Sequence, residues 1–147
     1  MSESLGNFYV IVAEPKFGGN VGAIARVMAN FGFKNLILFN PCDLDDECYS
    51  RAKHAFSLID EAKIFDSFED AISDMDYLVA TSSISYSSDK KHLRNPIYLE
   101  DFSERLLEIK GKIGLVFGRE DYGLYNHEIA KCDVMVRIPS SEEYPTL

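Results

Sequence analysis

Residues 113–124 read IGLVFGREDYGL, and this stretch indicates most clearly how the chain folds. Four of its first five residues are apolar, which is typical of a short strand buried on both faces of a parallel sheet. A polar turn bracketed by Gly118 and Gly123 follows, and glycine tolerates backbone angles that other residues avoid. Because open α/β sheets bind ligands beyond the carboxyl ends of their strands, we interpret residues 118–124 as a candidate ligand loop. An ordinary strand-to-helix turn is the alternative.

The rest of the chain alternates between strand-like and helix-like segments. Five further apolar segments are expected to form strands, at residues 8–13, 35–40, 63–65, 77–80 and 134–138. Helices are expected between them, at residues 21–31, 49–60, 68–75, 99–109 and 125–131. Six strands alternating with helices predict an α/β fold, with a mostly parallel sheet and helices on both faces. With 147 residues and no internal repeat, the chain is expected to form a single domain.

The composition is that of a globular protein, with 46% hydrophobic and 27% charged residues. No apolar run approaches the roughly 18 residues that a membrane helix needs, and the start MSESLGN resembles no signal peptide. We therefore expect a cytoplasmic protein without a membrane partner.

The three cysteines, Cys42, Cys48 and Cys132, form no CxxC pair, and reduced thiols are the simplest interpretation. The spacing of Cys42, Cys48 and His54 raises the question of a zinc site. A fourth ligand is not evident, so no metal is expected.

The net charge of −9 argues against a protein that holds nucleic acid by its overall charge. An RNA partner would need local cations, and two segments could supply them. The first is the expected helix with Arg51, Lys53 and His54. The second is the polar loop at residues 84–95, with Lys90, Lys91, His92 and Arg94, for which a solvated mobile loop is the alternative.

The helix expected at residues 21–31 carries the best candidate for a functional cation. We expect Asn20 to cap this helix and Gly32 to end it. Arg26 is the only charged residue between Lys16 and Lys34, and Gly22 lies one turn before it. Without a side chain there, we expect open space beside the guanidinium and an arginine that faces a ligand. A solvated arginine is the alternative.

Common phosphate and nucleophile motifs, such as GxxxxGK[ST], GxGxxG and GxSxG, are missing. Glu120 lies inside the candidate ligand loop, where a carboxylate would repel the phosphates of a nucleotide cofactor. It would tolerate S-adenosylmethionine, whose sulfonium and ammonium groups are positively charged.

Three motifs in series resemble those of the SpoU, or SPOUT-class, RNA ribose 2′-O-methyltransferases. They are PKFGGNVGAIARVMANFG (15–32), LVFGREDYGL (115–124) and IPSSEEYPTL (138–147). The last two are most similar to the TrmJ branch, which methylates position 32 in the tRNA anticodon loop. The resemblance covers nearly the whole chain and implies a deep trefoil knot, a homodimer, and S-adenosylmethionine as cofactor. RNA rather than DNA is the implied substrate, because only RNA has the 2′-hydroxyl.

The resemblance also implies site residues. The positions that match the family's catalytic residues are Arg26, Asn20 and Glu120. Those that match its cofactor-binding residues are Thr81, Ser82, Gly118, Glu120, Gly123, Leu124 and Ile138. The candidates for RNA contacts are Lys16, Arg26, Arg51, Lys53, Lys90, Lys91 and Arg94.

The chain departs from the family pattern in two places. The family has an arginine after the threonine-serine turn, where this chain has Ser83 and Ile84, so Lys90, Lys91 or Arg94 is expected to replace that contact. The third motif reaches Leu147 before the expected Asn-Leu-Ser and the helix that completes the knot. A ribosomal RNA methyltransferase and a non-catalytic RNA-binding dimer of the same fold are the alternatives.

Overall fold

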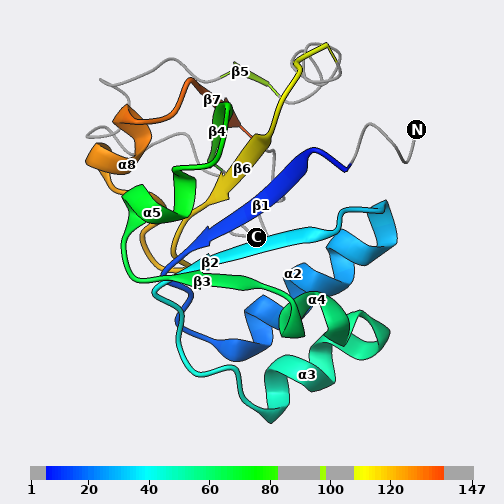
Figure 1. Ribbon diagram of the computed structural model, residues 1–147. Coiled ribbons are helices and arrows are strands. Elements are labelled where there is room, and N and C mark those ends of the chain that lie inside the picture. Colours follow the sequence, from blue (N-terminus) through cyan, green and yellow to red (C-terminus); the bar gives the residue numbers. More distant parts are fainter. Residues whose placement is uncertain (1–5, 83–96, 99–107, 138–147) are drawn as a thin grey trace.

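The computed structural model describes residues 6–82, 97–98 and 108–137. A seven-stranded sheet forms its centre, in the order β3-β2-β1-β6-β4-β7-β5, and every neighbouring pair is parallel (Figure 1). The strands are β1 (Phe8–Ala13), β2 (Asn35–Phe39), β3 (Lys63–Phe65), β4 (Tyr77–Ser82), β5 (Ile97–Tyr98), β6 (Ile113–Phe117) and β7 (Val134–Arg137). The helices are α2 (Gly18–Phe31), α3 (Asp46–Ala52), the 3-10 turn η1 (Lys53–Ala55), α4 (Phe56–Asp60), α5 (Phe68–Ile72) and α8 (Asn126–Ala130).

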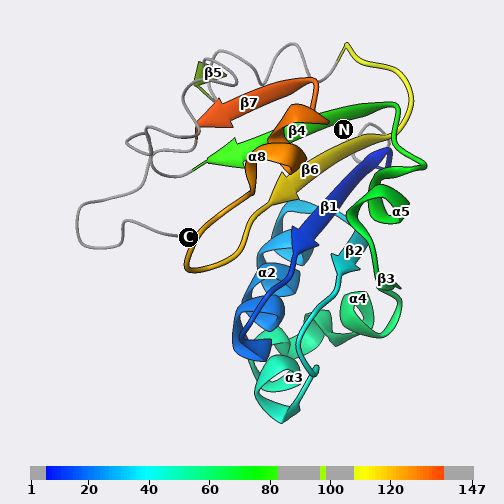
Figure 2. The ribbon, with the colours of Figure 1, turned by 90° about the vertical axis from the view of Figure 1, so that its left-hand side faces the viewer.

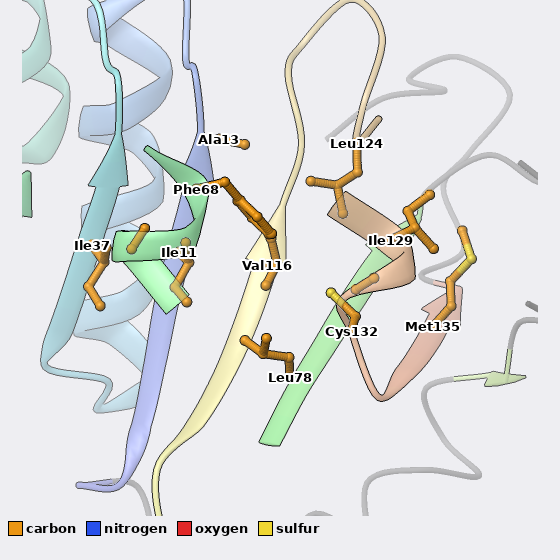
Figure 3. Close-up of a cluster of buried hydrophobic side chains, with 12 residues drawn as sticks. Ile11, Ala13, Ile37, Phe68, Leu78, Val116, Leu124, Ile129, Cys132 and Met135 are labelled. Carbon is orange, nitrogen blue, oxygen red and sulfur yellow. The ribbon is translucent and has the colours of Figure 1, made fainter. Parts of the chain in front are cut away.

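Helices cover both faces of the sheet, as the sequence predicts (Figure 2). Alternation along β1 divides its side chains between two hydrophobic clusters. Val10 and Val12 pack in the cluster that contains the buried residues of α2, α3 and α4. Ile11 and Ala13 pack in the opposite cluster with residues of α5 and α8, as Figure 3 shows. Strands buried on both faces explain why these segments lack polar residues.

The strand order brings the loops that follow β1, β6 and β4 together at the carboxyl ends of the strands. β6 lies between β1 and β4, so the carboxyl ends of these three strands are neighbours. The loop that leads from β1 to α2 therefore lies beside residues 118–124, which follow β6. The fold thus brings the first two family motifs together at the edge where parallel α/β sheets bind ligands.

The structure corrects several boundaries that were predicted from the sequence. The helix α2 starts at Gly18 with Phe17 at the cap position, so the prediction that Asn20 caps it is wrong. The segment 49–60 is not one helix, because Lys53 has a φ of 57° and separates α3 from η1 and α4. The strand predicted to end at Asn40 stops one residue earlier, since Asn40 has a φ of 45°.

At the other end of α2 the prediction is confirmed: Gly32 closes the helix in the left-handed conformation, with a φ of 85°. The strand predicted at 77–80 continues through Ser82, so Thr81 and Ser82 belong to β4 rather than to a turn. Most of the helix expected at 99–109 lies outside the described residues, as does the third motif with its expected knot. Among the helices that the structure describes, none is long and apolar enough to cross a membrane.

Candidate functional site

Glu120 joins the two loops at the carboxyl edge of the sheet. Its carboxylate accepts hydrogen bonds from the backbone N–H of Lys16, at 3.0 and 3.2 Å, and of Phe17, at 3.4 Å. It also accepts one from the side-chain amide of Asn20, at 3.0 Å. A carboxylate at the N-terminus of α2 also interacts favourably with the helix dipole. Asn20 therefore serves the contact between the loops instead of capping its own helix.

These contacts affect the ionisation of Glu120. Burial raises the pKa of the carboxyl, but hydrogen bonds from the Lys16 backbone and the Asn20 side chain outweigh it, so the pKa lies below its ordinary value. Glu120 is therefore ionised at neutral pH. A negative charge held at this edge is compatible with a cationic ligand and unfavourable for a phosphate.

A second contact between the loops is the ion pair of Lys16 and Asp121, whose charged atoms lie 2.5 Å apart. The Asp121 carboxylate raises the pKa of Lys16, and Lys16 lowers that of Asp121. Both side chains are more than half exposed, so the pair contributes little to stability. Lys16, a candidate for RNA contacts, already has an acidic partner in this structure.

The loop from Gly118 to Leu124 is closed tightly on itself. The backbone N–H and C=O of Arg119 pair with those of Gly123, at 3.0 and 2.9 Å. A Cβ atom at Gly118 would lie 2.2 Å from the Gly123 carbonyl carbon, and Gly123 has a φ of 88°. Both glycines are therefore required by the shape of the loop. Leu124 is buried in the core and anchors the end of the loop (Figure 3).

Arg119 is a feature of this loop that the sequence analysis missed. Its side chain is 3% exposed and lies between the carboxylates of Glu14, which follows β1, and Glu128 in α8. Asn40 and Arg119 hold the pKa of Glu14 below its ordinary value. Arg119 lies 105 residues from Glu14 and 9 residues from Glu128 in the sequence, and neither separation matches the period of a helix or a strand. The one signal in the sequence is therefore the position of Arg119 directly after a buried strand.

The residues predicted to bind the cofactor from β4 lie beside this loop. Thr81 and Ser82 end β4, the strand next to β6, and the Thr81 hydroxyl donates to the Val116 carbonyl at 2.9 Å. The structure thus brings together most of the predicted cofactor residues, namely Thr81, Ser82, Gly118, Glu120, Gly123 and Leu124. Ile138 lies outside the described residues.

The expected open space beside Arg26 is not present. A Cβ atom at Gly22 would lie 2.0 Å from the Cys48 carbonyl oxygen, because α3 crosses α2 at this residue. Gly22 is buried at this crossing, whereas Arg26 is exposed one turn later. Glycine at position 22 therefore permits close packing of two helices and makes no room for a ligand.

The predicted RNA contacts are only partly placed. Arg51 and Lys53 are both exposed, in α3 and η1, and Arg51 pairs with Glu47 at 3.2 Å. Lys90, Lys91 and Arg94 lie outside the described residues. Within the part of the chain that the structure describes, no group of three or more histidine, cysteine or acidic residues could hold a metal ion.

Comparisons with known proteins agree with this arrangement. The model of the SpoU rRNA Methylase family matches residues 7–147. The tRNA (cytidine-2′-O-)-methyltransferase TrmJ of Methanocaldococcus jannaschii is 48% identical over 139 residues, which cover 94% of this chain and 60% of that protein. The chain therefore spans about three-fifths of the length of this relative.

Solved structures of methyltransferases share the fold. TrmJ from Z. mobilis superimposes with a TM-score of 0.83 at 25% identity, over 95% of this chain and 61% of that one. The SpoU methyltransferase AviRb from Streptomyces viridochromogenes, solved with AdoMet, superimposes with a TM-score of 0.67 at 22% identity, over 92% and 52%. The family match over nearly the whole sequence, with both loop motifs together at one edge of the sheet, shows that this chain belongs to the SpoU rRNA Methylase family.

Proposed function

We propose that this protein is an S-adenosylmethionine-dependent RNA ribose 2′-O-methyltransferase that acts on tRNA, at position 32 of the anticodon loop. The 48% identity to a tRNA (cytidine-2′-O-)-methyltransferase carries the ribose methylation and the tRNA substrate, and position 32 is proposed from the resemblance of the motifs to the TrmJ branch. The contact of Glu120 with the loop before α2 supports it, because it joins the first two family motifs into one site.

The cofactor would be held by the loop at 118–124 together with Thr81, Ser82 and Ile138. The loop at 118–124, Thr81 and Ser82 offer hydroxyl, backbone and carboxylate groups, and these groups suit the chemistry of S-adenosylmethionine. Glu120 and Asp121 favour a cationic ligand over an anionic one. When bound, S-adenosylmethionine supplies the electrophilic methyl group.

Arg26 is our candidate for the catalytic residue. The ribose hydroxyl is a weak nucleophile, and its attack on the methyl carbon requires loss of its proton and stabilisation of the developing negative charge. Arginine stays protonated in proteins and is therefore a poor base. We propose that Arg26 orients the hydroxyl and stabilises the alkoxide, while an RNA phosphate or water accepts the proton. Asn20 and Glu120 would position the start of the helix that carries Arg26.

RNA binding would depend on local cations, because the whole chain carries a net charge of −9. The candidates are Lys16, Arg26, Arg51 and Lys53 among the described residues, together with Lys90, Lys91 and Arg94. Affinity is then expected to fall steeply with salt. We place this reaction in the cytoplasm.

We further propose that the enzyme is a homodimer with the exposed side of α2 at its interface. Val27 and Phe31 are 53% and 68% exposed on this helix, and Phe17 just before it is 62% exposed. Burying these side chains against a second copy would remove apolar surface from water. Arg26 lies beside them, so the interface would adjoin the proposed catalytic residue.

The proposal is tested with full-length protein, methyl-labelled S-adenosylmethionine and unmodified tRNA, followed by alkaline hydrolysis. A 2′-O-methyl group removes the hydroxyl that attacks the neighbouring phosphodiester, so label is expected in alkali-resistant dinucleotides. Label in mononucleotides would indicate base methylation and refute the ribose assignment. If tRNA stays unlabelled but ribosomal RNA is labelled, the substrate proposal is wrong, and absence of label with both favours the non-catalytic RNA-binding dimer.

Substitution of Arg26 tests the mechanism. We expect Arg26→Ala to abolish methyl transfer while cofactor affinity stays nearly unchanged, because the exposed side chain lies on α2 and outside the loop at 118–124. Single-turnover assays and equilibrium binding of S-adenosylmethionine measure the two effects separately. Lys34→Ala, just beyond the same helix, serves as the control. Most of the activity persisting in Arg26→Ala would refute the assigned role.

A further inference from the structure

We propose that Arg119 is the positioning residue of the loop at 118–124 and that it sets the cofactor affinity by holding this loop in one conformation. The inference rests on the proposed function for the identity of the cofactor. Its structural basis is the buried guanidinium of Arg119, which contacts Glu14 after β1 and Glu128 in α8. None of these contacts depends on residues outside the described ranges.

The guanidinium of Arg119 connects the loop to two other elements. Its Nη1 and Nη2 atoms donate to the two oxygens of Glu128, at 2.9 and 2.8 Å, in a bidentate arrangement. Its Nε atom donates to Glu14 at 2.7 Å, and Nη1 also donates to the Gly123 carbonyl at 3.1 Å. Every guanidinium nitrogen therefore has an acceptor, and these acceptors lie after β1, in α8 and at the far end of the loop.

The two carboxylates are themselves held in place. The second oxygen of Glu14 accepts a hydrogen bond from the Asn40 amide at 2.8 Å. Glu128 accepts another from the backbone N–H of Tyr125 at 2.7 Å, at the start of α8. Arg119 thus connects the ends of β1 and β2 with the start of α8, which are separate elements in sequence.

Arg119 and Glu128 are shielded from water, whereas the Glu14 side chain is 31% exposed. Glu128 is 1% exposed, and the ring of Tyr125 covers the guanidinium, with its centroid 3.6 Å from the central carbon of Arg119. Burial opposes the charge on Arg119, but the hydrogen bonds that it donates to Glu128 and Glu14 outweigh this effect and hold the pKa of Arg119 above its ordinary value. The arginine is therefore charged whenever the protein is folded.

Glu120 connects the contacts of Arg119 to the candidate cofactor site. Glu120 follows Arg119 directly and holds the start of α2 through Lys16, Phe17 and Asn20. If Arg119 loses its partners, the loop is free to shift, and Glu120 and Gly118 shift with it. Arg119 itself acts only through the loop, because its donors are all directed at protein acceptors.

We would test this with Arg119→Gln in the full-length protein. The variant leaves two carboxylates without their shared cation, and we expect its Kd for S-adenosylmethionine to rise by about 10- to 100-fold, by analogy with the loss of residues that orient metal ligands. Binding is measured well below the melting temperature, where a residue that only adds stability leaves the Kd unchanged. Lys112→Gln is the matched control, since Lys112 pairs with Asp74 at 2.6 Å at the opposite end of β6.

A second variant keeps the test decisive if Arg119→Gln folds poorly. Arg119→Gln combined with Glu128→Gln removes the uncompensated carboxylate of Glu128 and allows an amide pair in its place. We expect this double variant to bind cofactor more weakly than the wild type, because no cation then connects the loop to Glu14 and α8. An unchanged Kd in folded Arg119→Gln, or a folded double variant that binds as tightly as the wild type, would overturn the proposal.

Hydrogen exchange without cofactor separates this inference from the proposed function. In the wild type the amides of Arg119 and Gly123 are hydrogen-bonded to each other's carbonyls, so we expect slow exchange there and fast exchange in Arg119→Gln. If the wild type does not bind S-adenosylmethionine, the proposed cofactor is wrong, and exchange still decides whether Arg119 holds the loop. Equal exchange in both proteins refutes that role.

Discussion

Replacing Gly22 with alanine sets two physical effects against each other. Helix propensity alone predicts that Gly22→Ala in the middle of α2 stabilises the protein by about 1 kcal/mol. The structure predicts the opposite sign, because the new methyl group would lie 2.0 Å from the Cys48 carbonyl oxygen and 3.1 Å from the Ala52 amide nitrogen. The direction of the change in stability therefore decides between them.

The magnitude follows from the helix crossing. A carbon normally approaches a carbonyl oxygen no closer than about 3.3 Å, so α3 has to move away from α2 by roughly 1 Å. The obstacle is backbone and cannot turn aside, which places the strain near the upper end of the typical 1–3 kcal/mol for overpacking. After subtraction of the gain in propensity, we expect a net loss of about 2 kcal/mol, or roughly 4–8 °C in melting temperature for a chain of this size.

Thermal unfolding followed by circular dichroism measures this difference directly. Gly19→Ala in the same helix is the matched control, since its Cβ atom would meet the end of the flexible, exposed Glu47 side chain at 2.6 Å. Gly19 is itself buried, but the far end of the exposed Glu47 side chain can turn aside, so we expect the control to unfold within about 2 °C of the wild type. A melting temperature of Gly22→Ala equal to or above that of the wild type would refute the close approach of α2 and α3.

Two further substitutions test the electrostatics of the two ends of β6. Glu120 has a lowered pKa in the folded state, so its contribution is present above the unfolded-state pKa and disappears as the pH falls through the folded-state pKa. We therefore expect Glu120→Gln to lower the free energy of unfolding most near neutral pH and progressively less below about pH 4.5. Urea denaturation at several pH values measures this. A difference between wild type and variant that does not change with pH would contradict the expectation. Lys112→Gln breaks an exposed ion pair with Asp74, and we expect its melting temperature to match that of the wild type within error. A clear drop would mean that this pair matters more than its exposure suggests.

Much of the fold could be predicted from sequence because its signals are local. The apolar segments at 8–13 and 113–117 form strands as expected, since strands buried on both faces contain few polar residues. The left-handed Gly32 also ends α2 as expected. The interruption at Lys53 could not be foreseen, because packing of α3 and α4 against the same face overrides the local preference for one helix.

The candidate site shows the same division. From the sequence alone it could be seen that residues 15–32 and 115–124 resemble motifs of the SpoU methyltransferases, because such motifs are runs of consecutive residues. Only the tertiary structure decided the roles of Asn20, Gly22 and Arg119. Their partners are Glu120, the Cys48 backbone, and Glu14 with Glu128, and nearly all of these lie many residues away. Burial strengthens these contacts between residues that are far apart in the sequence, and no local sequence pattern predicts them.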